Sequence, residues 1–384
     1  MIKREPAEVG GLYYRLLPEG RVEQHVADTI PPVKPREAVD FNRNWPSNWV
    51  GEGVQAGAGR FPLSEPETYA LASFIASRPN IFTWVAGHTF SGVLLRPGFS
   101  IPDERMAPPD LHHFRMVGAK GTELSGYPAV CAFSGFRINH GEEIHGTVEW
   151  GYENFGIYTW IAEYWAPHQA AGVKIDNFAG WFLDHPGGDD LRMVQWGDEK
   201  LGRNAFVDWY DYNHPELGKV ELGGWDLIRT LYNPPEQLLA EVVQPFPDWF
   251  LFQLQLSPLL AWRKVEVKAL GAGHWAIRTV IENTGYLPTF CSVKALQTKS
   301  VRGVRAKLIA GPDVAIIGSS AERDVGELGG RAFKASSAVL GFLADHTDDR
   351  VVVEWIVAGQ PRSTVVLEAR HDRAGCIRQE IALG

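Results

Sequence analysis

The segment Asp40–Pro97 combines a turn, a helix and a strand, and it constrains the fold more than any other part of the chain. It begins with D-F-N-R-N-W-P and continues with S-E-P-E-T, in which Ser64 and Glu67 have the spacing of a capping box. We therefore predict a helix that begins at Ser64 and stops before Pro79. The short apolar run Ile81–Ala86 is typical of a strand buried in a parallel sheet. Together these elements predict an α/β fold.

His88 lies just past the end of this predicted strand. Open α/β sheets place ligands and reacting groups at the carboxyl ends of their strands, so His88 is a candidate functional residue. Within the preceding helix, Leu71, Ala72 and Ile75 share one face and are expected to be buried.

A second helix and strand follow downstream. Gly146–Gly156 predicts a short helix with Trp150 and Tyr152 as buried anchors, and Ile157–Ala162 predicts a strand that ends at Glu163. A glutamate in this place is commonly a solvated group or a salt-bridge partner. Its position at the edge of a sheet also suits a catalytic carboxylate.

These pieces resemble, in the same order, the zinc metallocarboxypeptidases of the carboxypeptidase A/B type. The resemblance implies that the N-R-N turn, with Asn42 and Arg43, binds the terminal carboxylate of the substrate. Arg43 could equally pair with Asp40 to fix the turn. The resemblance also implies that His88 is the third zinc ligand.

The family's general base lies in a segment that the sequence V-E-W at Val148–Trp150 resembles. Glu163 follows Trp150 by thirteen residues, as in the family pattern, which implies that Glu163 is the catalytic carboxylate. Val148 is implied to lie at the base of the pocket for the last side chain of the substrate. A valine there favours terminal Phe, Leu or Tyr over Lys or Arg. The adjacent Glu149 would reverse this preference if the register were shifted.

The zinc site is incomplete in this pattern. The family's first two zinc ligands, an H-x-x-E pair, belong well before the turn, yet the 41 residues before Asn42 contain a single histidine, His25. His140 and Glu143 match H-x-x-E, but they follow His88 and are interpreted as a chance match. Either the chain starts late, which is the favoured reading, or it is a family member that has lost its metal site.

The chain is expected to contain two domains, since 384 residues exceed the usual size of a single core. Residues 1–260 are predicted to form an N-truncated, carboxypeptidase-like α/β/α domain with a mixed sheet. An insertion at about 165–224 includes a predicted helix, Asp189–Tyr210. From Trp262 onward, short alternating strands predict a small all-β sandwich domain over 261–384.

Composition excludes several other classes of function. The net charge is −9 and no basic run is present, so nucleic acid is not an expected partner. No apolar run approaches the roughly 18 residues that a membrane helix needs. The first residues lack the apolar core of a signal peptide, which indicates the cytoplasm by default, although a late start could hide a secretory signal. The adjacent His112 and His113 are predicted to be surface histidines.

Two functions are therefore open. The first is zinc-dependent hydrolysis of the C-terminal bond of a peptide or protein, with this chain inactive in isolation because His88 is its one assigned zinc ligand. The second is a non-catalytic pseudoenzyme module that binds peptide C-termini.

Overall fold

The computed structural model describes residues 39–55, 57–98, 102–136, 146–176, 180–181, 184–201, 205–215, 218–332 and 347–384. These residues fall into two compact units. Unit 1 contains residues 89–92 and 164–242, and unit 2 contains residues 39–88, 93–163 and 243–384. Each unit is described by itself.

A four-stranded sheet forms the centre of the α/β part of unit 2. Its strands are β1 (Thr83–Thr89), β2 (Val93–Arg96), β3 (Ala129–Cys131) and β4 (Tyr158–Tyr164), in the order β1-β4-β2-β3. Strand β2 pairs parallel to β3 and antiparallel to β4. The sheet is therefore mixed, as predicted.

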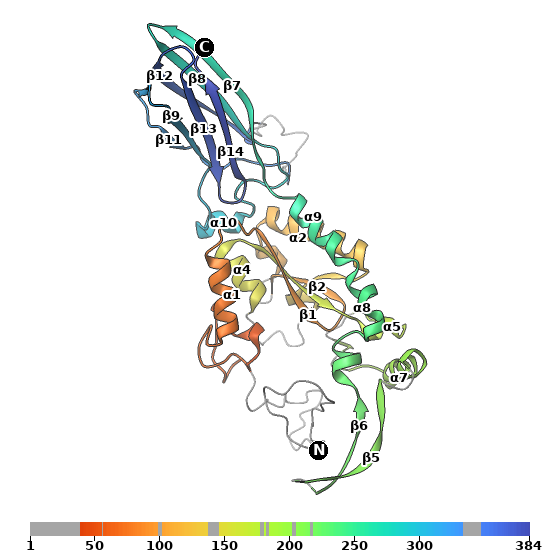
Figure 1. Ribbon diagram of the computed structural model, residues 1–384. Coiled ribbons are helices and arrows are strands. Elements are labelled where there is room, and N and C mark those ends of the chain that lie inside the picture. The colour runs from red at the N-terminus through yellow and green to blue at the C-terminus, as the bar shows by residue number, and fades with distance from the viewer. Residues whose placement is uncertain are drawn as a thin grey trace. The chain divides into compact units, whose positions relative to one another are not determined.

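Helices cover both faces of this sheet (Figure 1). On one face, α2 (Pro108–Ser125) and α9 (Phe246–Gln255) pack on β4, where the Trp160 ring lies 5.5 Å from the Phe114 and Trp249 rings between their centroids. On the other face lies α4 (Thr147–Phe155), beside α1 (Pro66–Ala76). The predicted α/β/α arrangement is confirmed. None of the helices in the described ranges has the length and apolar content needed to cross a bilayer.

The start of α1 differs from the prediction. Its N-cap residue is Glu65, with Pro66 at the first helical position, and no side chain caps it. The Ser64 hydroxyl instead donates to the Glu65 carboxylate and accepts from Asn44, so the predicted capping box is wrong. Leu71 is 41% exposed, whereas Ala72 and Ile75 are buried, because the buried face of α1 is narrower than expected.

The ends of two strands also differ from the prediction. Strand β1 begins later than Ile81 and continues through His88, and β4 continues through Glu163. Both side chains are therefore held by paired strands and do not lie past the strand ends. Strand β1 is at the edge of the sheet and is only partly buried, not enclosed on both faces.

Unit 1 contains a two-stranded ribbon and short helices. The predicted helix Asp189–Tyr210 is wrong in its second half: α7 ends at Leu201, and Phe206 begins a strand. The alternating sequence from Phe206 pairs antiparallel with the strand that begins at Gly218, and this pairing overrides the helical pattern. The elements are α5 (Pro167–Ala170), α7 (Gly187–Leu201), β5 (Phe206–His214), β6 (Gly218–Trp225), η3 (Leu227–Leu231) and α8 (Glu236–Val243).

The last part of unit 2 is a β-sandwich (Figure 1). One sheet has the order β10-β12-β8-β7 and the other β11-β9-β13-β14, and both face one core that includes Ile277, Trp355 and Leu367. The all-β prediction is confirmed, although the edge strands β11 and β14 and the inner strand β9 were not predicted. The elements are β7 (Leu260–Gly271), β8 (His274–Asn283), α10 (Val293–Thr298), β9 (Arg305–Ala310), β10 (Val314–Ile317), β11 (Glu322–Asp324), β12 (Arg350–Gly359), β13 (Thr364–His371) and β14 (Gly375–Ala382).

Within unit 2, two buried charged side chains connect the sandwich to the α/β part. Arg373, between β13 and β14, donates to the carbonyl oxygens of Phe155 and Gly156 at the end of α4. In the opposite direction, Asp110 of α2 accepts from the backbone N–H groups of Val293 and Lys294 at 2.8 and 3.1 Å, at the start of α10. Each charge satisfies backbone groups that a helix end leaves without partners.

Candidate functional site

His88 and Glu163 lie on neighbouring strands and come together in unit 2. The distance between His88 Nδ1 and Glu163 Oε1 is 3.8 Å. The imidazole is one-quarter exposed and the carboxyl is largely buried. Because β1 and β4 are adjacent in the sheet, residues 75 positions apart in the sequence form one pair.

The electrostatic surroundings of this pair include the N-R-N turn. Burial raises the pKa of Glu163 to about 8, while the Arg43 guanidinium acts to lower it and Asp40 to raise it. Burial also lowers the pKa of His88, with Asp40 opposing the shift and Arg43 adding to it. The charges of the turn therefore act on the pKa of both members of the pair.

Arg43 ends the short helix η1 (Phe41–Arg43), which Asp40 caps by accepting from the Asn42 N–H at 2.8 Å. The Arg43 Nη1 atom lies 3.7 Å from Asp40 Oδ2 and donates to the Asn42 carbonyl oxygen. The pairing of Arg43 with Asp40 is thus present. The side chain is 25% exposed, and its remaining nitrogens make no hydrogen bond within the described ranges. A planar guanidinium suits a carboxylate, which can accept two parallel hydrogen bonds from it.

The two asparagines of the turn have different roles. Asn42 Oδ1 accepts from both the backbone N–H and the hydroxyl of Thr147, at 2.8 and 2.6 Å, and so holds the start of α4. Asn44 is fully buried, donates to the Ala58 carbonyl oxygen and accepts from the Thr68 hydroxyl. Sequence reasoning missed this structural role of Asn44, because its partners lie 14 and 24 residues away.

Val148 is completely buried in a cluster with Val93, Leu95, Ala132 and Ile161. Its side chain packs against Ile161, which is two residues before Glu163 in β4 and therefore on the same face of the sheet as Glu163. The adjacent Glu149 is also buried. The assignment of Val148 to the base of a substrate pocket stays a prediction.

A catalytic zinc takes three protein ligands. Among the described residues, no group of three His, Cys, Asp or Glu side chains is placed to hold a metal. The His88–Glu163 pair offers one imidazole and one carboxylate 3.8 Å apart, which does not fit that ligand set. His25, His140 and Glu143 lie outside the described residues.

The two adjacent histidines of α2 are placed differently from each other. His112 is exposed, as predicted, but His113 is 4% exposed, so the prediction of a surface residue is wrong for His113. Its ring stacks on Tyr158 with 3.8 Å between the ring centroids. Residue 113 is on the face of α2 that packs against the sheet, next to Phe114.

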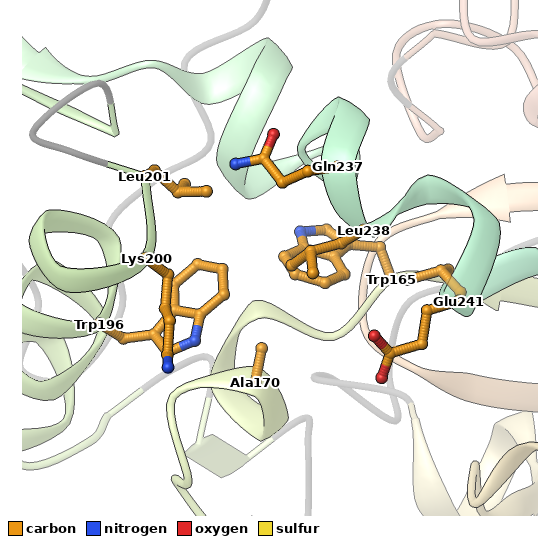
Figure 2. A pocket seen from close by; sticks show the side chains of 9 residues that line it. Trp165, Ala170, Trp196, Lys200, Leu201, Gln237, Leu238 and Glu241 are labelled. Atoms are coloured by element: carbon orange, nitrogen blue, oxygen red, sulfur yellow. The ribbon is translucent and has the colours of Figure 1, made fainter.

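Unit 1 contains a cavity of about 380 Å³ (Figure 2). The indole rings of Trp165 and Trp196 line it, with the Lys200 side chain beside Trp196 and Glu241 on α8. None of the residues predicted for the site lines this cavity.

Two parts of the chain match known families. Residues 19–164 match the zinc carboxypeptidase family, and residues 259–382 match a domain of unknown function. Carboxypeptidase A1 of Sus scrofa is 29% identical over 132 residues, which are 31% of this chain and 29% of that protein. Carboxypeptidase A6 of Mus musculus is 39% identical over 66 residues, 15% of each chain.

The chain thus spans less than a third of the length of these curated relatives. A solved structure of thrombin activatable fibrinolysis inhibitor aligns with a TM-score of 0.29 and 18% identity, over 46% of this chain and 45% of that one. The family match over residues 19–164 covers the turn with Arg43, strand β1 with His88 and strand β4 with Glu163. The chain is therefore a metallocarboxypeptidase-like protein.

Proposed function

We propose that the α/β part of this chain acts on peptide C-termini in a carboxypeptidase-type hydrolytic reaction. In this proposal Arg43 binds the terminal carboxylate, with the Asn42 amide beside it. Glu163 carries a proton between water and the leaving amine. The observation that carries the proposal is the His88–Glu163 pair, whose Nδ1 and Oε1 atoms lie 3.8 Å apart on neighbouring strands. The partly exposed guanidinium of Arg43 acts on the pKa of both residues.

Recognition is the better supported half of this function. Arg43 offers donors in a plane, and a carboxylate can accept two parallel hydrogen bonds from them. The contacts of η1 with Asp40 and of Asn42 with Thr147 hold the turn in one conformation before a ligand arrives. Such preorganisation lowers the entropy lost on binding.

The second candidate function is binding without cleavage. It is favoured by the ligand set around His88, which among the described residues does not reach the three ligands of a catalytic zinc. We assign no step through a metal. In this second function the chain recognises peptide C-termini without hydrolysing them.

The binding half is tested by calorimetry with an N-acetylated tripeptide that ends in a free Phe carboxylate and with its C-terminal amide. We expect the full chain to bind the free acid about tenfold more tightly, since a hydrogen bond to a charged group is worth about 1.5–3 kcal/mol. Arg43→Gln should remove the difference between the two peptides. Arg60→Gln, at an exposed arginine, is the matched control. Equal affinities for acid and amide would contradict the assignment.

The hydrolytic half is tested separately, by release of free Phe and by metal analysis of the purified chain. Hydrolysis predicts release of free Phe and one zinc per chain, whereas binding without cleavage predicts no release and less than one zinc per chain. One tightly held zinc with turnover would show that the chain completes its ligand set, and Glu163→Gln should then abolish turnover while leaving acid-over-amide binding intact.

A further inference from the structure

The cavity of unit 1 is lined by side chains from α5, α7 and α8 (Figure 2). Its described lining residues all belong to unit 1 and do not include Arg43, His88 or Glu163. Sites for small molecules commonly enclose about 300–1,000 Å³. At about 380 Å³ this cavity has room for a small ligand.

One wall of the cavity is aromatic and fixed. Trp165 is 3% exposed, and its indole N–H donates to the Thr230 carbonyl oxygen at 2.7 Å. The Trp196 ring lies 5.9 Å from the Trp165 ring between centroids, so the two rings form a continuous surface. Leu201 and Leu238 extend this surface with aliphatic side chains. The wall therefore suits the apolar part of a ligand.

Two opposite charges belong to the same lining. They come from Lys200 on α7 and Glu241 on α8, which are both exposed. Within the part of the chain that the structure describes, neither side chain makes an ion pair or a hydrogen bond. In Figure 2 their charged ends lie on either side of Ala170, whereas Leu201 is at the other end of the view. The cavity thus has a charged end and an apolar end.

The signs of these charges select the kind of ligand. A simple anion would be attracted by Lys200 but repelled by Glu241, and the reverse holds for a simple cation. A zwitterion gives each of the two side chains a partner of opposite sign. An apolar group attached to that zwitterion would reach the wall of Trp165 and Trp196.

We propose that this cavity binds a free α-amino acid with a large apolar side chain. The carboxylate of the ligand accepts from the Lys200 ammonium, and the ammonium of the ligand donates to the Glu241 carboxylate. The side chain of the ligand lies against the Trp165 and Trp196 rings. This site does not depend on the function proposed for Arg43.

The test is calorimetry on the full chain with four probes. They are L-phenylalanine, L-phenylalaninamide without the carboxylate, N-acetyl-L-phenylalanine without the ammonium, and glycine without the side chain. We expect L-phenylalanine to bind about three- to fivefold more tightly than the amide or the N-acetyl compound, as for ion pairs between partly exposed groups. Glycine should bind at least about tenfold more weakly, because it buries no apolar side chain.

Variants assign each charged group of the ligand to its partner. Lys200→Gln should remove the preference for L-phenylalanine over its amide, and Glu241→Gln should remove the preference over the N-acetyl compound. Lys174→Gln and Glu236→Gln make the same charge changes at exposed residues of unit 1 that do not line the cavity. These two control variants should bind L-phenylalanine as the unmodified chain does.

Failure of L-phenylalanine to bind at millimolar concentration would overturn the proposal. Equal binding of L-phenylalanine and either modified compound would also overturn it, and so would equal binding of glycine. An effect of the control variants as large as that of Lys200→Gln and Glu241→Gln would make the attraction a property of the whole surface. Loss of L-phenylalanine binding in Arg43→Gln would place the ligand at Arg43 and not in this cavity.

Discussion

The guanidinium of Arg373 donates to the carbonyl oxygen of Phe155 at 2.7 Å, across 218 residues of sequence. The same group donates to the carbonyl oxygens of Gly156, Phe290 and Pro79. Helix α4 ends at Phe155, and Gly156 follows in a left-handed conformation with φ of 59°. A Cβ atom on Gly156 would lie 2.2 Å from the Ala295 nitrogen, so the approach of α10 requires glycine here.

Arg373→Met is expected to destabilise the protein by about 3 kcal/mol or more, because several buried carbonyl oxygens lose their donor. Arg373→Lys should recover part of the loss, since lysine keeps the charge but cannot reach as many acceptors. The measurement is the free energy of unfolding in urea. Arg370→Met, at an exposed position of β13, should change it by less than about 0.5 kcal/mol. A similar loss in both methionine variants would contradict the role of Arg373.

Asn42→Ala should destabilise the protein by about 1–2 kcal/mol, because the first N–H of α4 and the Thr147 hydroxyl lose their acceptor. Asn42→Asp keeps an acceptor oxygen and should lose less. Thermal melting compares the two variants. Equal destabilisation by Asn42→Ala and Asn42→Asp would contradict the stabilising role of the hydrogen bonds from Thr147.

Val148→Asp is expected to destabilise the chain by several kcal/mol, since it buries a carboxylate against Leu95 and Ile161. Circular dichroism and yield of soluble protein measure this effect. Val54→Asp, at a valine that is 75% exposed, is the control. A well-folded Val148→Asp protein that binds peptides ending in Lys or Arg would instead support a pocket at this residue.

His113 should make stability fall as the solution is acidified. Its pKa is about 3 in the folded chain and about 6.5 when unfolded, so its contribution is present above pH 6.5 and is lost as pH falls toward 3. Between pH 7 and pH 5 the loss is about 2 kcal/mol. His113→Phe should therefore show a flatter dependence of unfolding free energy on pH over this interval. The exposed His112→Gln variant should keep the original slope.

Local patterns predicted the elements better than their ends. The helix α4 and the alternating strands of the sandwich were visible because each pattern is complete within its own segment. The boundaries of α1 and α7 were wrong because distant residues decide them. The Asn44 amide donates a hydrogen bond to the Ser64 hydroxyl, which does not cap α1. Phe206 is in a strand because it pairs with β6.

Part of the candidate site could also be predicted. The resemblance indicated Arg43, His88 and Glu163; the structure places His88 Nδ1 3.8 Å from Glu163 Oε1, and the roles of all three stay predictions. The hydrogen bonds of Arg373 to the end of α4 could not be predicted, because they join the sandwich to the α/β part. No local pattern in either segment encodes such a contact.

Helix α4 is held at its first residue by Asn42 and at its last by Arg373. Heat or denaturant that loosens the sandwich would therefore free the helix that fixes the turn bearing Arg43. Amide protons in α4 and in strands β13 and β14 should then exchange with solvent in one cooperative opening. Ligand recognition and the integrity of the sandwich would share a single melting transition, so a destabilising change far from Arg43 would lower the fraction of chains able to bind.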